Sequence, residues 1–178
     1  MSYEEILKKI EDYLPIKKIE KDKYAEVFTP ANLINEMLDL LPKSVWSNPD
    51  YKWLDPANGI GNFPMIAYSR LMKGLKENFP IKQERSKHII TKMLYMVELN
   101  PKNVAVSRKI FGKDANIFCG SFLKEELKGK KKVNVINPDI QKQFGIEKYD
   151  VIMGNPPYQM RVGPDKTEPL WDKFVINS

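Results

Sequence analysis

The sequence has few of the residues that build metal sites and disulfide frameworks. One cysteine, Cys119, and one histidine, His88, occur in 178 residues, so an internal disulfide is excluded and a zinc site of the usual ligands is not expected. No run of about 18 apolar residues occurs, so no membrane-spanning helix is expected. The first residues also lack the layout of a secretion signal. These absences predict a protein of the reducing cytoplasm, without a metal and without a membrane anchor.

The chain does have enough apolar residues for a core, together with an excess of positive charge. Hydrophobic residues make up 42% of it, which is typical of a folded domain rather than a disordered chain. Lysine and arginine number 29 against 23 aspartates and glutamates, a formal net charge of +6. That balance permits a polyanionic partner without proving one.

Helical and strand-like patterns alternate along the chain. Four short apolar runs have the composition of buried strands, and each leads into small or polar residues: 51–54, 94–99, 116–119 and 149–153. Helices are expected before and between them: 2–14, 30–41, 63–75, 83–92 and 101–111. Strands separated by helices indicate an α/β fold with a parallel sheet and flanking helices.

Some local features complete the expected fold. Thr29 and Asn100 each precede a proline, and we expect each to cap the helix that follows. Residues 133–148 have the composition of a weakly structured loop, and residues 161–178 that of a loop with one short helix. Cys119 is expected to be a small core residue of its strand.

The loop after the first strand has the composition of a ligand-binding turn. Gly59 and Gly61 allow a tight turn just before a helix N-terminus, where anions are favoured. A dinucleotide fingerprint would need a further glycine at position 64, where the chain has Pro64. The spacing is therefore a poor match for a nicotinamide or flavin site, and by itself a plain turn is an equal alternative.

An acid, Glu98, ends the second apolar run. At this place in nucleotide-binding α/β folds, a carboxylate accepts hydrogen bonds from ribose hydroxyls. The alternative is a solvated acid at the end of a strand.

The segment Asn155-Pro156-Pro157-Tyr158 is the most distinctive feature of the chain. Two successive prolines fix the backbone and lack N–H groups, so the Pro156 carbonyl is held in a defined direction. Asn155 adds an amide oxygen and Tyr158 a flat aromatic face. Together they could bind a planar group that carries an NH2. The alternative is a stiff turn with Tyr158 packed on the core.

These segments resemble the motifs of the S-adenosylmethionine-dependent N6-adenine DNA methyltransferases of restriction–modification type. The family's catalytic motif, (Asn/Asp/Ser)-Pro-Pro-(Tyr/Phe/Trp), is matched by residues 155–158, and its first motif is similar to residues 55–63. Its Phe-Thr-Pro motif occurs at residues 28–30, and residues 94–101 look like its ribose-binding segment. The resemblance implies a Rossmann-like methyltransferase fold. The order of the motifs resembles the group with a C-terminal target-recognition region.

The resemblance also implies roles for individual residues. Asn155, Pro156 and Tyr158 would be catalytic and would grip an adenine flipped out of DNA. The residues that would hold S-adenosylmethionine are Thr29, Pro30, Asp55, Ala57, Gly59, Glu98, Leu99, Ser121 and Phe122. Ser121 stands where the family commonly has an aspartate, so its contact with the cofactor's adenine amine is expected to be weaker or differently arranged.

The resemblance further divides the chain. Residues 1–23 would be an N-terminal helix and charged linker, and residues 24–178 the cofactor-binding and catalytic part of the methyltransferase domain. Because the family's sheet has seven strands, the domain is expected to be truncated after the fourth, with the target-recognition region absent or supplied by a separate partner. Other hypotheses stay open: methylation of an RNA base or a protein glutamine amide, or a cofactor-binding fragment that is inactive alone.

Overall fold

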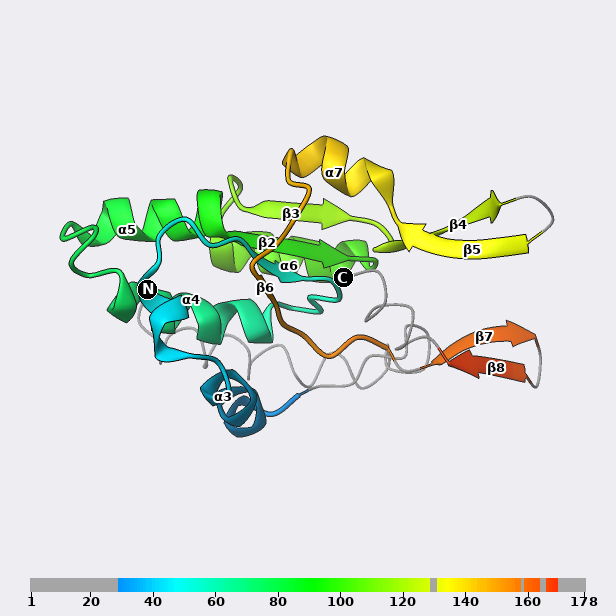
Figure 1. Cartoon of the computed structure of the whole chain (residues 1–178), viewed down its shortest axis with the longest axis horizontal. Coiled ribbons are helices and arrows are strands. Elements are labelled where there is room, and N and C mark those ends of the chain that lie inside the picture. Colours follow the sequence, from blue (N-terminus) through cyan, green and yellow to red (C-terminus); the bar gives the residue numbers. More distant parts are fainter. Residues whose placement is uncertain (1–28, 129–130, 158, 164–165, 170–178) are drawn as a thin grey trace.

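The computed structural model describes residues 29–128, 131–157, 159–163 and 166–169 (Figure 1). At its centre is a four-stranded sheet with the strand order β3-β2-β1-β6. Its strands are β1 (Trp53–Asp55), β2 (Leu94–Glu98), β3 (Asn116–Cys119) and β6 (Val151–Ile152). All three pairings are parallel. The parallel α/β fold and all four strands expected from the sequence are therefore confirmed.

Both faces of this sheet are covered, which explains why its central strands are continuous apolar runs. Side chains alternate along β2, so Leu94 and Met96 join one buried cluster while Tyr95 and Val97 join another. The larger cluster packs against α3 and α4, which lie below the sheet in Figure 1. The smaller includes Ile140 of α7, which lies above it.

Five α-helices lie within the described ranges: α3 (Ala31–Asp39), α4 (Asn62–Gly74), α5 (Lys82–His88), α6 (Pro101–Phe111) and α7 (Pro138–Phe144). A 3-10 turn, η2 (Lys43–Ser47), follows α3, and a π-helical turn, η3 (Ile89–Met93), extends α5 toward β2. No helix among the described residues has the length and apolar composition to cross a membrane.

One of the two expected caps is present. The Asn100 side chain accepts a hydrogen bond from the Lys102 backbone N–H at 3.0 Å, with Pro101 at the first helical position. The expected cap at Thr29 is wrong, because the N-cap of α3 is Pro30 and no side chain bonds there. The Thr29 hydroxyl has a different partner, Asn155.

Two regions expected to be irregular are ordered instead. The loop expected over 133–148 is wrong, because β4 (Leu123–Lys128) and β5 (Lys131–Ile136) form an antiparallel hairpin that α7 follows. The hairpin projects beyond the sheet in Figure 1. Likewise, β7 (Gln159–Gly163) pairs with β8 (Lys166–Pro169) where a loop was expected.

Three further expectations concern Cys119 and two terminal helices. Cys119 is exposed rather than in the core, because β3 is an edge strand and this residue is its last. The helix expected over residues 2–14 lies outside the described residues, and so do residues 170–175, where the short helix of the 161–178 segment is expected.

Candidate active site

The candidate site lies at the carboxyl edge of the sheet, where three neighbouring strands end. Asp55 ends β1, Glu98 ends β2, and β6 stops at Ile152, three residues before Asn155. Because the strands are parallel, these ends lie at one edge, which is where open α/β sheets bind ligands. Pairing continues past β6, since the Met153 N–H donates to the Leu54 carbonyl at 2.9 Å.

The loop between β1 and α4 is a rigid turn that depends on glycine. Gly59 and Gly61 have φ angles of +58° and +98°, which side chains disfavour. A Cβ on Gly61 would also lie 2.9 Å from the Phe111 ring, so this glycine lets the start of α4 approach α6. Within the loop, the Gly61 N–H donates to the Asn58 carbonyl at 2.9 Å.

Polar side chains of α6 bond to this loop and to Glu98. The Asn58 amide donates to Ser107 Oγ at 2.8 Å, and both residues are buried. Asn103, one turn before Ser107, donates to Glu98 Oε1 at 3.3 Å. Neither Asn103 nor Ser107 is among the residues that the sequence predicts for the site. A pattern in the sequence does indicate them, because Asn103 and Ser107 are four residues apart, and polar residues with this spacing share one face of a helix.

Glu98 links the glycine loop to the start of α6. Its Oε2 accepts from the Gly59 N–H at 2.7 Å, and its Oε1 accepts from the Asn100 N–H at 2.7 Å. The residue is 8% exposed. The carboxylate therefore fixes the turn directly, and the ribose-binding role stays a prediction.

Asp55 is a buried acid in the floor of the site. It is 1% exposed, and its Oδ1 accepts from the Ala57 N–H at 3.0 Å. Burial raises the pKa of the Asp55 carboxyl from 3.8 to about 8; the bond from Ala57 opposes the rise and the nearby charge of Glu98 adds to it. The charge of Glu98 disfavours ionisation of Asp55, and a cationic ligand would relieve that cost.

Asn155 forms a hydrogen bond with Thr29, the first residue that the structure describes. Its Nδ2 donates to Thr29 Oγ1 at 3.1 Å, across 126 positions of sequence. Pro156 and Pro157, which follow it, are half-buried, and Tyr158 lies outside the described residues. The structure thus brings Thr29 and Asn155 together.

The remaining predicted site residues differ in how much surface they present. Leu99 is 60% exposed beside Glu98, and Pro30 is also exposed. Ser121 is exposed and donates its hydroxyl to the Leu123 carbonyl at 2.7 Å. Phe122 is only 3% exposed within the smaller core cluster, so a ligand could touch no more than its edge. Among the described residues, no cluster of acidic, histidine and cysteine side chains could hold a metal ion.

Comparison with known proteins gives a family and a fold. Residues 3–175 match the family model described as N-6 DNA Methylase. A Mycoplasma pneumoniae protein described as an uncharacterized adenine-specific methylase is 30% identical over 222 aligned positions. That alignment covers 86% of this chain and 51% of the relative, so the chain spans about half the relative's length.

A solved structure shares the fold. It comes from Vibrio vulnificus and is described as a modification subunit of a type I restriction enzyme. The match has a TM-score of 0.53 and 16% identity, and it covers 92% of this chain and 31% of that one. At this identity the likeness concerns the fold alone.

Proposed function

The chain belongs to the N-6 DNA methylase family, and from that premise we propose that it transfers a methyl group from S-adenosylmethionine to the exocyclic amine of adenine in DNA. We further propose that it acts in restriction–modification, with residues 24–178 as the cofactor-binding and catalytic part. The observation that carries this proposal is the bond between Asn155 and Thr29, because it joins two family motifs at the edge where Asp55 and Glu98 also lie.

The residues of the site fit the chemistry of S-adenosylmethionine, which has a cationic methionine end and a flat adenine end. Asp55 and Glu98 supply two carboxyl groups. Gly59 has no atom within 4 Å of the place of a Cβ, so open space adjoins the turn. Leu99 offers an exposed apolar side chain beside Glu98.

Each residue then has a proposed role. Asp55, Ala57 and Gly59 would hold the methionine end, covered by Thr29 and Pro30. Glu98 would bind the ribose. Leu99, Ser121 and the edge of Phe122 would border the adenine. When bound, the cofactor supplies a methyl group already activated by its sulfonium sulfur.

The chain itself has to align the amine and support the charge that develops on it. An adenine amine is a poor nucleophile because its lone pair is delocalised into the ring. The Asn155 side-chain oxygen and the Pro156 carbonyl would accept the two amine hydrogens. Those bonds strengthen as the nitrogen becomes positive, so they stabilise the transition state more than the ground state. Tyr158 would stack on the flipped base, which offsets part of the cost of unstacking.

The test is transfer of a labelled methyl group to duplex DNA, RNA and protein in parallel. We expect label in DNA, recovered as N6-methyladenine after digestion, and none when Asn155→Ala replaces the wild type. Asn78→Ala, at an exposed position, is the matched control and should retain activity. Label in RNA or protein alone would overturn the DNA assignment.

A binding measurement belongs beside the activity assay. The chain spans about half of its curated relative, and we propose that DNA recognition involves a further region or subunit. Calorimetry with S-adenosylmethionine shows whether the site binds the cofactor. Binding without turnover would support a chain that needs such a partner, whereas the absence of binding would overturn the proposed cofactor.

A further inference from the structure

We infer that Thr29 is a positioning residue for Asn155, an inference that rests on the proposed function. Its hydroxyl accepts a hydrogen bond from the Asn155 NH2 at 3.1 Å. Because the amide nitrogen is bonded there, the oxygen on the same planar carbon is held in a fixed direction, which in the proposed reaction is toward the amine that is methylated. Thr29 thus acts on the reacting amine through Asn155, besides its expected place over the cofactor.

The chemistry of the amide group makes this partner necessary. A carboxamide carries its donor NH2 and its acceptor oxygen on the same planar carbon, so fixing one fixes the other. If the oxygen serves the substrate, the NH2 needs an acceptor nearby. Thr29 is buried and Asn155 is half-buried, so an Asn155 NH2 without an acceptor there would lose part of its hydration with no bond to compensate.

The hydroxyl of Thr29 does not cap the helix that follows it, α3. Threonine before a proline commonly caps a helix through its side chain, yet no side-chain bond caps α3. By contrast, Asn100 does cap α6. A purely local role for the Thr29 hydroxyl is therefore contradicted by its geometry.

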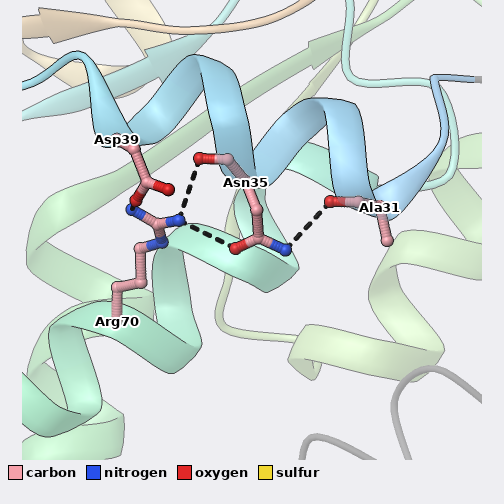
Figure 2. A network of polar contacts seen from close by, with 4 residues as sticks. All are labelled: Ala31, Asn35, Asp39 and Arg70. Carbon is pink, nitrogen blue, oxygen red and sulfur yellow. Dashed lines mark hydrogen bonds and ion pairs between the residues drawn. The ribbon is translucent and has the colours of Figure 1, made fainter.

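The helix that follows Thr29, α3, is held against α4 by a network of polar contacts (Figure 2). Arg70 of α4 donates to the carbonyl and the side-chain oxygen of Asn35 at 3.0 and 2.8 Å, and to Asp39 at 2.7 Å. The Asn35 amide donates back to the Ala31 carbonyl at 2.9 Å, near the start of α3. These bonds fasten α3 to α4, the helix that begins at the glycine loop.

The backbone on the other side of the bond is equally fixed. Met153 pairs with Leu54 of β1, and two prolines follow Asn155. With both backbones anchored, the bond between Thr29 and Asn155 helps to orient the Asn155 amide.

Two substitutions separate the hydroxyl from the shape of the side chain. Thr29→Val keeps the shape and removes the hydroxyl, whereas Thr29→Ser keeps the hydroxyl. We expect Thr29→Val to lower kcat for DNA methylation by about 10- to 100-fold, since small displacements at a reacting centre cost that much. KM for S-adenosylmethionine should change little, and Thr29→Ser should stay within about threefold of wild type. Thr91→Val is the control, because the Thr91 hydroxyl bonds to the Lys87 carbonyl on a different helix.

A second readout does not depend on turnover. NMR of the Asn155 side-chain NH2, assigned by its loss in Asn155→Ala, should show slower exchange with water in wild type and Thr29→Ser than in Thr29→Val. Equal exchange in all three proteins would overturn the inference, as would a Thr29→Val effect on KM for the cofactor alone. A wild type that does not bind S-adenosylmethionine would contradict the proposed function, and the NH2 exchange would still decide the relation between Thr29 and Asn155.

Discussion

Gly154 passes Asp55 so closely that no side chain would fit between them. A Cβ built on Gly154 would lie 2.7 Å from Asp55 Oδ1, and its φ angle is +149°. The backbone at Gly154, just before Asn155, therefore lies close to the side chain of Asp55, the acid that ends β1. That contact places the end of β1 and the segment that begins at Asn155 side by side.

Replacing Gly154 should consequently damage both stability and activity. We expect Gly154→Ala to lower the free energy of unfolding by about 1–3 kcal/mol, from strain and from the clash with a buried carboxyl. Gly112→Ala is the control, because Gly112 also has a positive φ, +92°, but has nothing within 4 Å of its Cβ position. Urea denaturation of both variants makes the comparison, and equal losses would show that the contact with Asp55 is unimportant.

The buried acid predicts a pH dependence of stability. Burial raises the pKa of Asp55 from 3.8 to about 8, so between these values the folded state holds a proton that the unfolded state has released. The contribution of this group is fully present below about pH 4 and is lost as pH rises through 8. We therefore expect the free energy of unfolding to fall more steeply between pH 6 and pH 9 in wild type than in Asp55→Asn.

Urea titrations at the two pH values measure this difference. The exposed Asp114 supplies the control, because Asp114→Asn should leave the wild-type slope unchanged. Parallel slopes for wild type and Asp55→Asn would show that Asp55 does not hold its proton in the folded state.

We expect the hydrogen bonds from Arg70 to Asn35 to contribute more to the free energy of unfolding than the ion pair between Arg70 and Asp39. Asp39 is 69% exposed and Arg70 22% exposed, and an exposed ion pair contributes about 0–1 kcal/mol. The guanidinium also lies 5.2 Å from the centre of the Trp46 ring, a cation–π contact. We expect Arg70→Met to cost about 1–3 kcal/mol of unfolding free energy and Asp39→Asn less, by urea denaturation. If Asp39→Asn lost more unfolding free energy than Arg70→Met, the ion pair would be the more important contact.

Much of the fold could be predicted because its central strands are continuous apolar runs. The 94–99 run coincides with β2, whose residues are all buried. The hairpin of β4 and β5 was missed because its first strand, Leu123–Lys128, is mostly charged. Helix α7 was missed although Asn137 caps it as Asn100 caps α6. It spans 7 residues, too few for a clear periodic pattern.

The site could be predicted as far as strand ends determine it. Asp55 and Glu98 lie at one edge because parallel strands end together. The bond between Thr29 and Asn155 spans 126 positions, and no local pattern encodes it. The cap expected at Thr29 failed for the same reason, since a distant partner engages the hydroxyl.

A buried hydrogen bond beneath the glycine loop gives the last prediction. Asn58 and Ser107 are 5% and 0% exposed, and their side chains are 2.8 Å apart. Ser107→Ala leaves one partner of the Asn58 amide missing, so we expect a loss of about 1–3 kcal/mol in unfolding free energy. The loop should loosen as well, so cofactor binding should weaken. Because Asn58→Ala removes the other half of the bond, the double variant should cost less than the sum of the single variants, with a coupling of about 0.5–3 kcal/mol. Strict additivity in urea denaturation of the four proteins would mean that this bond does not hold the loop on α6.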